Sequence, residues 1–329
     1  MILNGYATNS NKSYVFIRQG HDIPINAIER AIKEAYDNGI LGENILGSNF
    51  SFDMEVSLTG DSYVAGEEKA LMVAIEGKRS TPRFKPPFPA ASGLWKKPTN
   101  INNVKTISYV PEIIKNGSEW FKGTGTEKST GTAIVCLSGH INRPGMYEIP
   151  MGMTINDVLE NIGGGSNSET DIKMLQTGGP LGGVLGKEAF LTKIDFDEMA
   201  KSGAILGSGG IIVCDESVSV VDLIRNLVAF NQFESCGKCF PCRLGNTHMY
   251  DVLDRLCNSK SEPNDLALLE RIGNSMKIGS LCGHGQLGYN PISSSLKYFQ
   301  SEISDSINNI SEPLEKMLIP TRTRPNNLE

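Results

Sequence analysis

Three cysteines follow one another at intervals of three residues in the segment "ESCGKCFPCR" at 234–243. They are Cys236, Cys239 and Cys242, and a fourth cysteine, Cys282, stands in "SLCGHGQ" further along the chain. Zinc sites usually take four cysteines from two separated C-x2-C pairs, whereas a C-x2-C-x2-C run with one remote cysteine is typical of a [4Fe–4S] cluster. The spacing therefore favours an iron–sulfur cluster, with zinc as the alternative.

Small and cationic residues surround these cysteines. Gly237, Gly283 and Gly285 would let backbone N–H groups approach the sulfur atoms. Lys238 and Arg243 would offset the negative charge of a cluster. Both effects would raise the reduction potential of the cluster.

The other three cysteines have the pattern of buried free thiols. Cys136 and Cys214 fall on expected strands and Cys257 on an expected helix, where cysteine behaves as a small apolar residue. The chain has 7 cysteines, an odd number, and four of them group in two short motifs. A disulfide framework is therefore disfavoured and a reducing compartment is expected.

The charge and hydropathy of the chain exclude two broad classes of function. Its 329 residues include 31 Lys and Arg against 37 Asp and Glu, a net charge of −6, with no basic block that would follow a nucleic-acid backbone. No apolar run approaches the roughly 20 residues of a spanning helix, and "MILNGYATNS" lacks the pattern of a signal peptide. We therefore expect a cytoplasmic protein, or one peripheral to a membrane complex, that binds no nucleic acid and has no direct membrane insertion.

Residues 1–125 have the pattern of an α/β layer. "YVFIR" is a predicted strand, followed by a predicted helix whose apolar stripe runs from Ile25 to Ala35 and which Gly39 closes. "FDMEVSL" is a second predicted strand. The stretch at 81–99 holds five prolines, too many for the interior of a helix or strand, and is expected to be a loop.

Residues 131–213 form a predicted β-rich module with a single helix. The segment begins with a strand, a Pro-Gly turn and a second strand, and continues in a helix from Ile155 to Ile162 that glycines stop. It ends in the apolar strand "IIVC". This order of elements is typical of a β-grasp fold.

After residue 217 the strand pattern gives way to four apolar stripes at helical spacing, which predict a four-helix bundle over 217–310. The stripes are formed by Val221, Ile224, Leu227 and Val228; by Tyr250, Leu253 and Leu256; by Leu266, Leu269, Ile272 and Met276; and by Leu296, Phe299 and Ile303. The cysteine run falls between the first two helices and Cys282 just before the last. An antiparallel bundle would bring both loops to one end, and the tail at 311–329 is expected to be extended.

At these motifs the sequence resembles a known family. "ESCGKCFPCRLGNTHM" together with "SLCGHGQLGYNPISSSLKYF" is similar to the flavoprotein subunit of NADH dehydrogenases, the 51-kDa subunit of respiratory complex I. The second motif resembles most the relatives in NAD-dependent hydrogenases and formate dehydrogenases. "YVAGEEKALMVAIEGKRSTPRFKPPFPAASGLWKKPTNINNVKTI" is similar to the flavin and nicotinamide segment of the family. The resemblance implies the C-terminal part of a Rossmann-like flavin and NADH domain, an SLBB-like β-grasp module and a helical bundle that carries the cluster.

The resemblance also implies roles for individual residues. The residues that would edge the flavin and nicotinamide pocket are Tyr63, Gly66, Glu67 and Glu68, those that would face the dinucleotide are Lys85 and Phe88, and those that would bond the FMN are Asn102, Asn103 and Thr106. Glu68 is the expected catalytic-site carboxylate, because it can bond the nicotinamide amide, and Phe88 can stack on a planar base. Without the resemblance, Glu67 and Glu68 have the pattern of a solvated helix start, where acidic residues suit the helix dipole.

The function that the resemblance implies is electron transfer. NADH would give a hydride to FMN, and single electrons would leave through the [4Fe–4S] cluster. The expected partners are other redox subunits, namely a thioredoxin-like [2Fe–2S] subunit of the 24-kDa type and a larger iron–sulfur subunit. The expected cofactors are therefore the [4Fe–4S] cluster, FMN and NAD(H).

Part of the family pattern does not occur in this sequence. The family has a G-x-G-G-A-G-F-P loop for the FMN phosphate, and the glycine clusters "NIGGGSN", "TGGPLGGVLG" and "LGSGGI" have the pattern of turns instead. We therefore expect an N-terminally truncated flavin domain whose 329 residues do not hold FMN alone. Three hypotheses follow: a redox subunit whose missing third is encoded separately or lost from the gene model, a truncated non-catalytic iron–sulfur relay or assembly subunit, and a zinc-stapled structural module.

Overall fold

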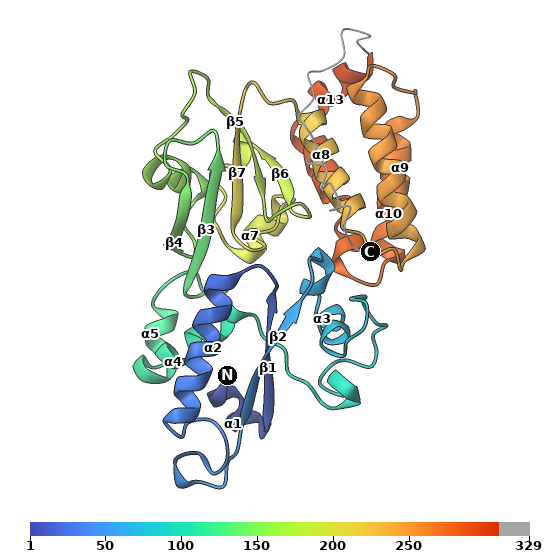
Figure 1. Ribbon diagram of the computed structural model, residues 1–329. Coiled ribbons are helices and arrows are strands. Elements are labelled where there is room, and N and C mark those ends of the chain that lie inside the picture. The colour runs from blue at the N-terminus through green and yellow to red at the C-terminus, as the bar shows by residue number, and fades with distance from the viewer. Residues whose placement is uncertain (309–329) are drawn as a thin grey trace. The chain divides into compact units, whose positions relative to one another are not determined.

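The computed structural model describes residues 1–308 of the chain, which form two compact units divided after Gly117 (Figure 1). The tail predicted to be extended, 311–329, lies outside the described residues. The finer division into domains at 1–125, 131–213 and 217–310 stays a prediction. Within the described residues no helix is both long and apolar enough to cross a membrane.

The first unit is built around a two-stranded parallel sheet. Its elements are α1 (Ile2–Thr8), β1 (Lys12–Arg18), α2 (Asp22–Asp37), η1 (Ile45–Gly47), β2 (Asp53–Thr59), η2 (Tyr63–Gly66), α3 (Glu68–Ile75), η3 (Leu94–Lys96) and α4 (Val104–Asn116). β1 and β2 pair in register from Lys12 opposite Asp53 to Arg18 opposite Thr59. Both predicted strands and the predicted helix are therefore confirmed.

The predicted apolar stripe of α2 is the face that the helix packs against the sheet. Ile28, Ile32 and Ala35 pack against a small core that includes Val15 and Phe52, and the helix ends at Asp37, two residues before Gly39. Gly39 has a φ of +67°, which glycine adopts at little cost. The proline-rich stretch at 81–99 contains no strand and only the short helix η3, so it is a loop, as the sequence predicts.

The second unit contains a five-stranded sheet (Figure 1). Its elements up to residue 215 are α5 (Ser118–Lys122), β3 (Thr132–Gly139), β4 (Gly145–Pro150), α6 (Ile155–Asp157), η4 (Val158–Ile162), β5 (Ile172–Thr177), β6 (Gly183–Gly186), η5 (Lys187–Ala189), α7 (Phe196–Lys201) and β7 (Gly210–Asp215). The strand order is β4-β3-β7-β5-β6, with β3 and β7 parallel and the other neighbours antiparallel. The predicted helix from Ile155 to Ile162 is confirmed as α6 with η4, and Thr154 begins it with a capping box.

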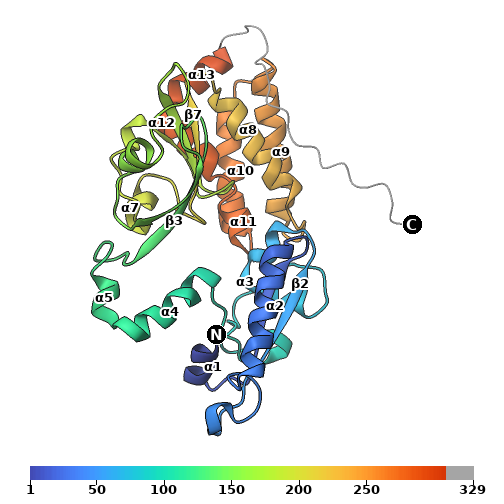
Figure 2. The same cartoon turned by 60° about the vertical axis from the view of Figure 1, so that its left-hand side comes forward.

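In the part of the chain up to residue 308, six helices follow the sheet. They are α8 (Val220–Phe233), α9 (Phe240–Cys257), α10 (Asp265–Gly279), α11 (Gly283–Gln286), α12 (Asn290–Tyr298) and α13 (Gln300–Asn308). α9 packs against both α8 and α10, and Figure 2 shows the three side by side. The first three predicted stripes correspond to α8, α9 and α10, and their apolar side chains form a core with Met249 and Leu253 fully buried.

The prediction of one continuous fourth helix is wrong. Phe299 leaves helical geometry, with φ −131° and ψ 31°, and separates α12 from α13. α12 packs against β6 and α8, whereas α13 packs against α8 and α9. Both halves of the stripe therefore pack against α8, with β6 beside the first half and α9 beside the second, and the chain turns between them.

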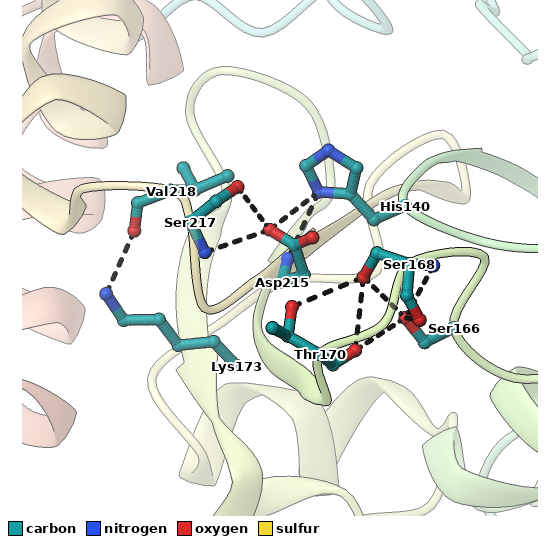
Figure 3. Close-up of polar contacts among 8 residues, drawn as sticks. All are labelled: His140, Ser166, Ser168, Thr170, Lys173, Asp215, Ser217 and Val218. Atoms are coloured by element: carbon teal, nitrogen blue, oxygen red, sulfur yellow. Dashed lines mark hydrogen bonds and ion pairs between the residues drawn. The ribbon is translucent and has the colours of Figure 1, made fainter. Parts of the chain in front are cut away.

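A polar junction connects the sheet to the helices within the second unit (Figure 3). Asp215, at the end of β7, is 4% exposed and accepts hydrogen bonds from the Ser217 N–H at 3.0 Å and the Ser217 hydroxyl at 2.6 Å. Its backbone N–H donates to His140 Nδ1 at 3.1 Å. Lys173 on β5 donates to the Val218 carbonyl at 2.9 Å and pairs with Glu302 on α13 at 2.9 Å. These contacts fix the start of α8 against the sheet.

The Asp215 carboxyl should make the stability of the second unit depend on pH. Hydrogen bonding by the Ser217 hydroxyl, helped by Ser168, outweighs burial and lowers the pKa of Asp215 to about 2 from 3.8. Because the pKa is lower in the folded state, this stabilisation is present above pH ~4 and is lost as the pH falls toward 2. It amounts to at most about 2 kcal/mol. Asp215→Asn should therefore lower the urea-unfolding free energy at pH 7 and have a smaller effect at pH 3, and equal stability of both proteins at pH 7 would contradict this role.

Candidate functional site

The cysteines of the two motifs lie at the ends of helices in the second unit. Cys236 lies in the turn between α8 and α9, Cys239 is the N-cap of α9, and Cys242 lies in its first turn. Cys282 is the N-cap of α11. Cys239 and Cys242 therefore lie beside the unpaired N–H groups of the N-terminus of α9, which carry a partial positive charge.

One hydrogen bond joins the loops of the two motifs. The Leu281 N–H, next to Cys282, donates to Cys239 Sγ at 3.4 Å. Burial raises the pKa of the Cys242 thiol to about 11, and the hydrogen bond with the Ser235 hydroxyl opposes this shift. Negative charge on the Cys282 sulfur would raise the pKa further. Cys239 and Cys236 add to the same shift in turn. Within residues 1–308 no group of three or more His, Cys, Asp or Glu side chains is arranged to hold a metal ion, so the set of four cysteine ligands stays a prediction.

Polar side chains not expected from the sequence contact the sulfur of Cys242. Asn246 Nδ2 lies 3.5 Å from Cys242 Sγ and donates to the Cys242 carbonyl at 3.0 Å. The Ser235 hydroxyl also lies 3.5 Å from Cys242 Sγ, and it accepts from the Gly237 N–H at 3.3 Å. The i, i+4 spacing from Cys242 to Asn246 on one helix face is the signal that could have indicated this contact.

The glycines near the cysteines differ in how much space they leave. A Cβ on Gly285 would lie 2.3 Å from Ser280 Oγ and 2.9 Å from Cys242 Cβ, so this position accepts no side chain without movement. Gly237 has a φ of +75°, in the region that favours glycine, and its carbonyl accepts from Arg243 Nη1 at 2.7 Å. A Cβ on Gly283 would meet Leu287 at an ordinary 3.7 Å. Gly285 is therefore the glycine packed most tightly beside Cys242, and the expected approach of the glycine N–H groups to the sulfur atoms stays a prediction.

Several buried polar atoms near the cysteine loops have no hydrogen-bond partner among the described residues. They are both side-chain polar atoms of Asn231, the Asn246 Oδ1 and the Ser280 Oγ. Asn231 is fully buried, and its carbonyl pairs with His284 Nε2 at 2.8 Å. Buried polar groups without partners are rare in native proteins. Of these atoms, the Asn231 Nδ2 and the Ser280 hydroxyl are donors, which is the kind of group that an anionic cofactor needs.

In the first unit, the two acidic residues at the start of α3 have different partners. Glu67 is the N-cap, and its Oε2 accepts from the Lys69 N–H at 3.0 Å and the Ala70 N–H at 2.8 Å. Glu68 is paired with Lys85, whose Nζ also lies 3.7 Å from Glu67 Oε1. The hydrogen bond to Glu68, opposed by desolvation, raises the pKa of Lys85. The structure therefore brings these three predicted site residues together.

Aromatic side chains stand near this ion pair in the sequence and face solvent. Tyr63 and Gly66 are the first and last residues of η2, the turn that leads into Glu67, and both are exposed. Phe88, three residues after Lys85, is 60% exposed. Exposed aromatic rings beside a charged pair are suited to stacking on a planar base.

The residues expected to bond FMN lie at the start of α4. Asn103 is the N-cap of α4, and its Oδ1 accepts from the Lys105 N–H at 2.9 Å. Asn102 donates to Asn100 Oδ1 at 3.2 Å, and Thr106 is exposed. Among the described residues, no hydrogen bond or ion pair joins this group to the Glu68–Lys85 pair. The structure thus places the two predicted groups on different elements of the first unit.

Comparisons with known proteins cover almost the whole chain. Residues 222–306 match the family described as the NADH-ubiquinone oxidoreductase-F iron-sulfur binding region, residues 1–112 match the Nuo51 FMN-binding domain, and residues 134–185 match the SLBB domain. All four cysteines of the two motifs lie inside the first of these matches.

Two curated relatives illustrate the similarity. The chain is 42% identical over 302 residues to the NADP-reducing hydrogenase subunit HndC of Solidesulfovibrio fructosivorans, covering 92% of this chain and 62% of that protein. It is 38% identical over 302 residues to a subunit of the NADH-quinone oxidoreductase of Rhizobium meliloti, covering 92% of this chain and 72% of that protein. The chain thus spans less than two thirds of the first relative.

The fold is similar to that of a solved hydrogenase. A chain in the crystal structure of the NAD+-reducing [NiFe]-hydrogenase in the H2-reduced state superposes with a TM-score of 0.82 at 27% identity. The match covers 93% of this chain and 51% of that chain. The fold is therefore shared with part of one chain of that hydrogenase.

Proposed function

This chain belongs to the NADH-ubiquinone oxidoreductase-F family, and we propose that it takes part in electron transfer from NADH through FMN to a [4Fe–4S] cluster and on to partner subunits. The observation that carries the proposal is the hydrogen bond from the Leu281 N–H to Cys239 Sγ, which joins the loop of Cys282 to the loop that holds the other three cysteines. The matched iron–sulfur region and FMN-binding domain support the same function.

The four thiolates would hold the cluster. Cys239 and Cys242 lie at the N-terminus of α9, and the Leu281 N–H and the Asn246 amide donate toward their sulfurs. Such donors stabilise added negative charge and so raise a reduction potential. A bound cluster supplies a site that accepts and releases one electron at a time. The cationic side chains of Lys238 and Arg243 would contribute in the same direction.

The start of α3 would bind the nicotinamide end of NADH. Glu68 would accept a hydrogen bond from the nicotinamide amide, and Lys85 would then turn from Glu68 to the dinucleotide phosphates. Phe88 would stack on a base, while Tyr63 and Gly66 would border the flavin. Asn102, Asn103 and Thr106, at the start of α4, would donate or accept hydrogen bonds with FMN, whose bound ring converts a hydride into single electrons.

We extend the proposal to the architecture and the partners. Residues 1–125 would belong to a Rossmann-like flavin and NADH domain, residues 131–213 to a β-grasp module, and residues 217–310 to a cluster-carrying bundle in which α12 and α13 share the place of the fourth helix. The relatives are named as subunits, which supports partners such as a thioredoxin-like [2Fe–2S] subunit and a larger iron–sulfur subunit.

The test is chemical and spectroscopic. Protein purified without oxygen, in complex with its partners, should contain about four iron atoms and four sulfides per chain in this site. Adding NADH should bleach its visible absorbance and produce the electron paramagnetic resonance signal of a reduced cluster. Zinc without sulfide would overturn the cluster. A cluster that dithionite reduces and NADH does not would instead favour a non-catalytic iron–sulfur relay.

A further inference from the structure

A buried lysine lies at the start of α3. Lys69 is the second residue of the helix and is 2% exposed, and among the described lysines it alone is buried. A cation in the first turn of a helix meets the positive end of the helix dipole, and burial removes its hydration. A lysine at this position is therefore unfavourable both for the helix dipole and for solvation. Natural proteins keep such unfavourable residues mainly at functional or strained sites.

The Lys69 ammonium binds the backbone of the proline-rich loop. Its Nζ donates to the carbonyl oxygens of Phe84 and Pro87. These two carbonyls flank Lys85, the residue that pairs with Glu68. The loop from 84 to 88 therefore passes over a single buried ammonium group.

The composition of this loop explains why a side chain is needed. Pro86, Pro87 and Pro89 have no N–H group, so the stretch cannot form a regular ladder of backbone hydrogen bonds. Carbonyl groups near the protein interior still need donors. An ammonium has three N–H bonds and can satisfy two carbonyls at once. Lys69 supplies what the backbone of the loop cannot.

The other end of α3 binds the same loop through a second charged side chain. Glu76, the C-cap of α3, accepts from the Trp95 N–H at 3.0 Å and pairs with Arg83. The loop is therefore attached to both ends of one short helix. The carbonyls that Lys69 binds, those of Phe84 and Pro87, are the attachment points that flank Lys85.

We propose that Lys69 is a positioning residue of the dinucleotide site. By holding the carbonyls of Phe84 and Pro87, it fixes the loop so that Lys85 and Phe88 face the dinucleotide beside Glu68. The inference rests on the proposed function, because it assumes that this loop contacts NADH. Lys69 itself does not touch the dinucleotide, and it acts through the geometry of the loop.

The test combines hydrogen exchange with steady-state kinetics on the assembled complex. Lys69→Met keeps the length of the side chain and removes its donors, and Lys33→Met makes the same change at an exposed position on α2. Lys69→Met should speed amide exchange in residues 84–97 roughly tenfold or more. It should also raise the KM for NADH roughly tenfold while kcat changes less than about twofold. Lys33→Met should change neither the amide exchange of this loop nor the KM for NADH.

The possible outcomes separate this inference from the proposed function. A wild-type complex that does not oxidise NADH overturns the proposed function, and exchange alone then decides whether Lys69 holds the loop. An active wild type with an unchanged KM in Lys69→Met overturns the positioning role, even if exchange is faster. If the Lys69→Met protein does not accumulate, the same measurements are made on Lys69→Gln, whose amide keeps N–H donors. Its rate of amide exchange and its KM for NADH should lie between those of the wild type and those expected of Lys69→Met. Wild-type values in Lys69→Gln would then overturn the proposal.

Discussion

Replacing Cys282 with serine should abolish the electron paramagnetic resonance signal of the reduced cluster and remove most of its iron. Cys282 is the N-cap of α11 and belongs to a different loop from the other three cysteines. The two loops are joined by the hydrogen bond from the Leu281 N–H to Cys239 Sγ. With three thiolates left, the cluster would lose the ligand that joins the two loops. Because a bound cofactor stabilises the folded state by its binding free energy, the helical part should also unfold several kcal/mol more easily.

The same result is expected for the cysteine run, and the chain offers a matched control. Cys236→Ser, Cys239→Ser and Cys242→Ser should each lose the signal. Cys257→Ala should keep the iron and the signal, because Cys257 is fully buried at the opposite end of α9 in the apolar core. An unaltered cluster in Cys282→Ser would defeat the ligand assignment.

The spacing of the cysteine run could be seen in the sequence, but its surroundings could not. Three cysteines at intervals of three have few uses, whereas the contact between Leu281 and Cys239 joins residues that are 42 positions apart. Such a contact depends on how α10 returns along α9. The polar groups around Cys242 likewise come from tertiary packing, apart from Asn246, whose i, i+4 spacing is local.

Apolar periodicity located the helices and missed the break between α12 and α13. Leu296, Phe299 and Ile303 keep helical spacing through the break, because all three pack against the same core. The turn at Phe299 arises from the neighbours of α12, which include β6. A one-dimensional pattern does not contain that information.

Lys69 shows that sequence patterns have the same limit at a candidate functional site. Beside Glu67 and Glu68, a lysine in the sequence has the pattern of a solvated helix start. In the structure its side chain turns inward and binds the carbonyls of a loop 15 and 18 residues away. Charge patterns predict solvation well only where the chain does not fold back over the charged group.

The structure also separates two acidic residues that the sequence presents as a pair. Glu67 is committed to the two N–H groups that it caps, and turning it to a ligand would leave them without a partner. Glu68 is held only by an ion pair with Lys85, in which both side chains are more than a third exposed. Exposed pairs of this kind contribute little to stability. Glu68 is therefore the carboxylate that can turn to a dinucleotide at low cost.

Glu68→Gln should lower kcat/KM for NADH by about 10- to 100-fold, since a hydrogen bond that involves a charged group contributes about 1.5–3 kcal/mol. Its urea-unfolding free energy should change by less than about 1 kcal/mol, because the Glu68–Lys85 pair is exposed. Glu67→Ala is the matched control, and it should lose about 0.5–2 kcal/mol of stability through the missing N-cap. Artificial-acceptor kinetics and urea titrations of the assembled complex measure both. Full kcat/KM in Glu68→Gln would remove Glu68 from the site, whereas a loss of stability equal to that of Glu67→Ala would give it a structural role instead.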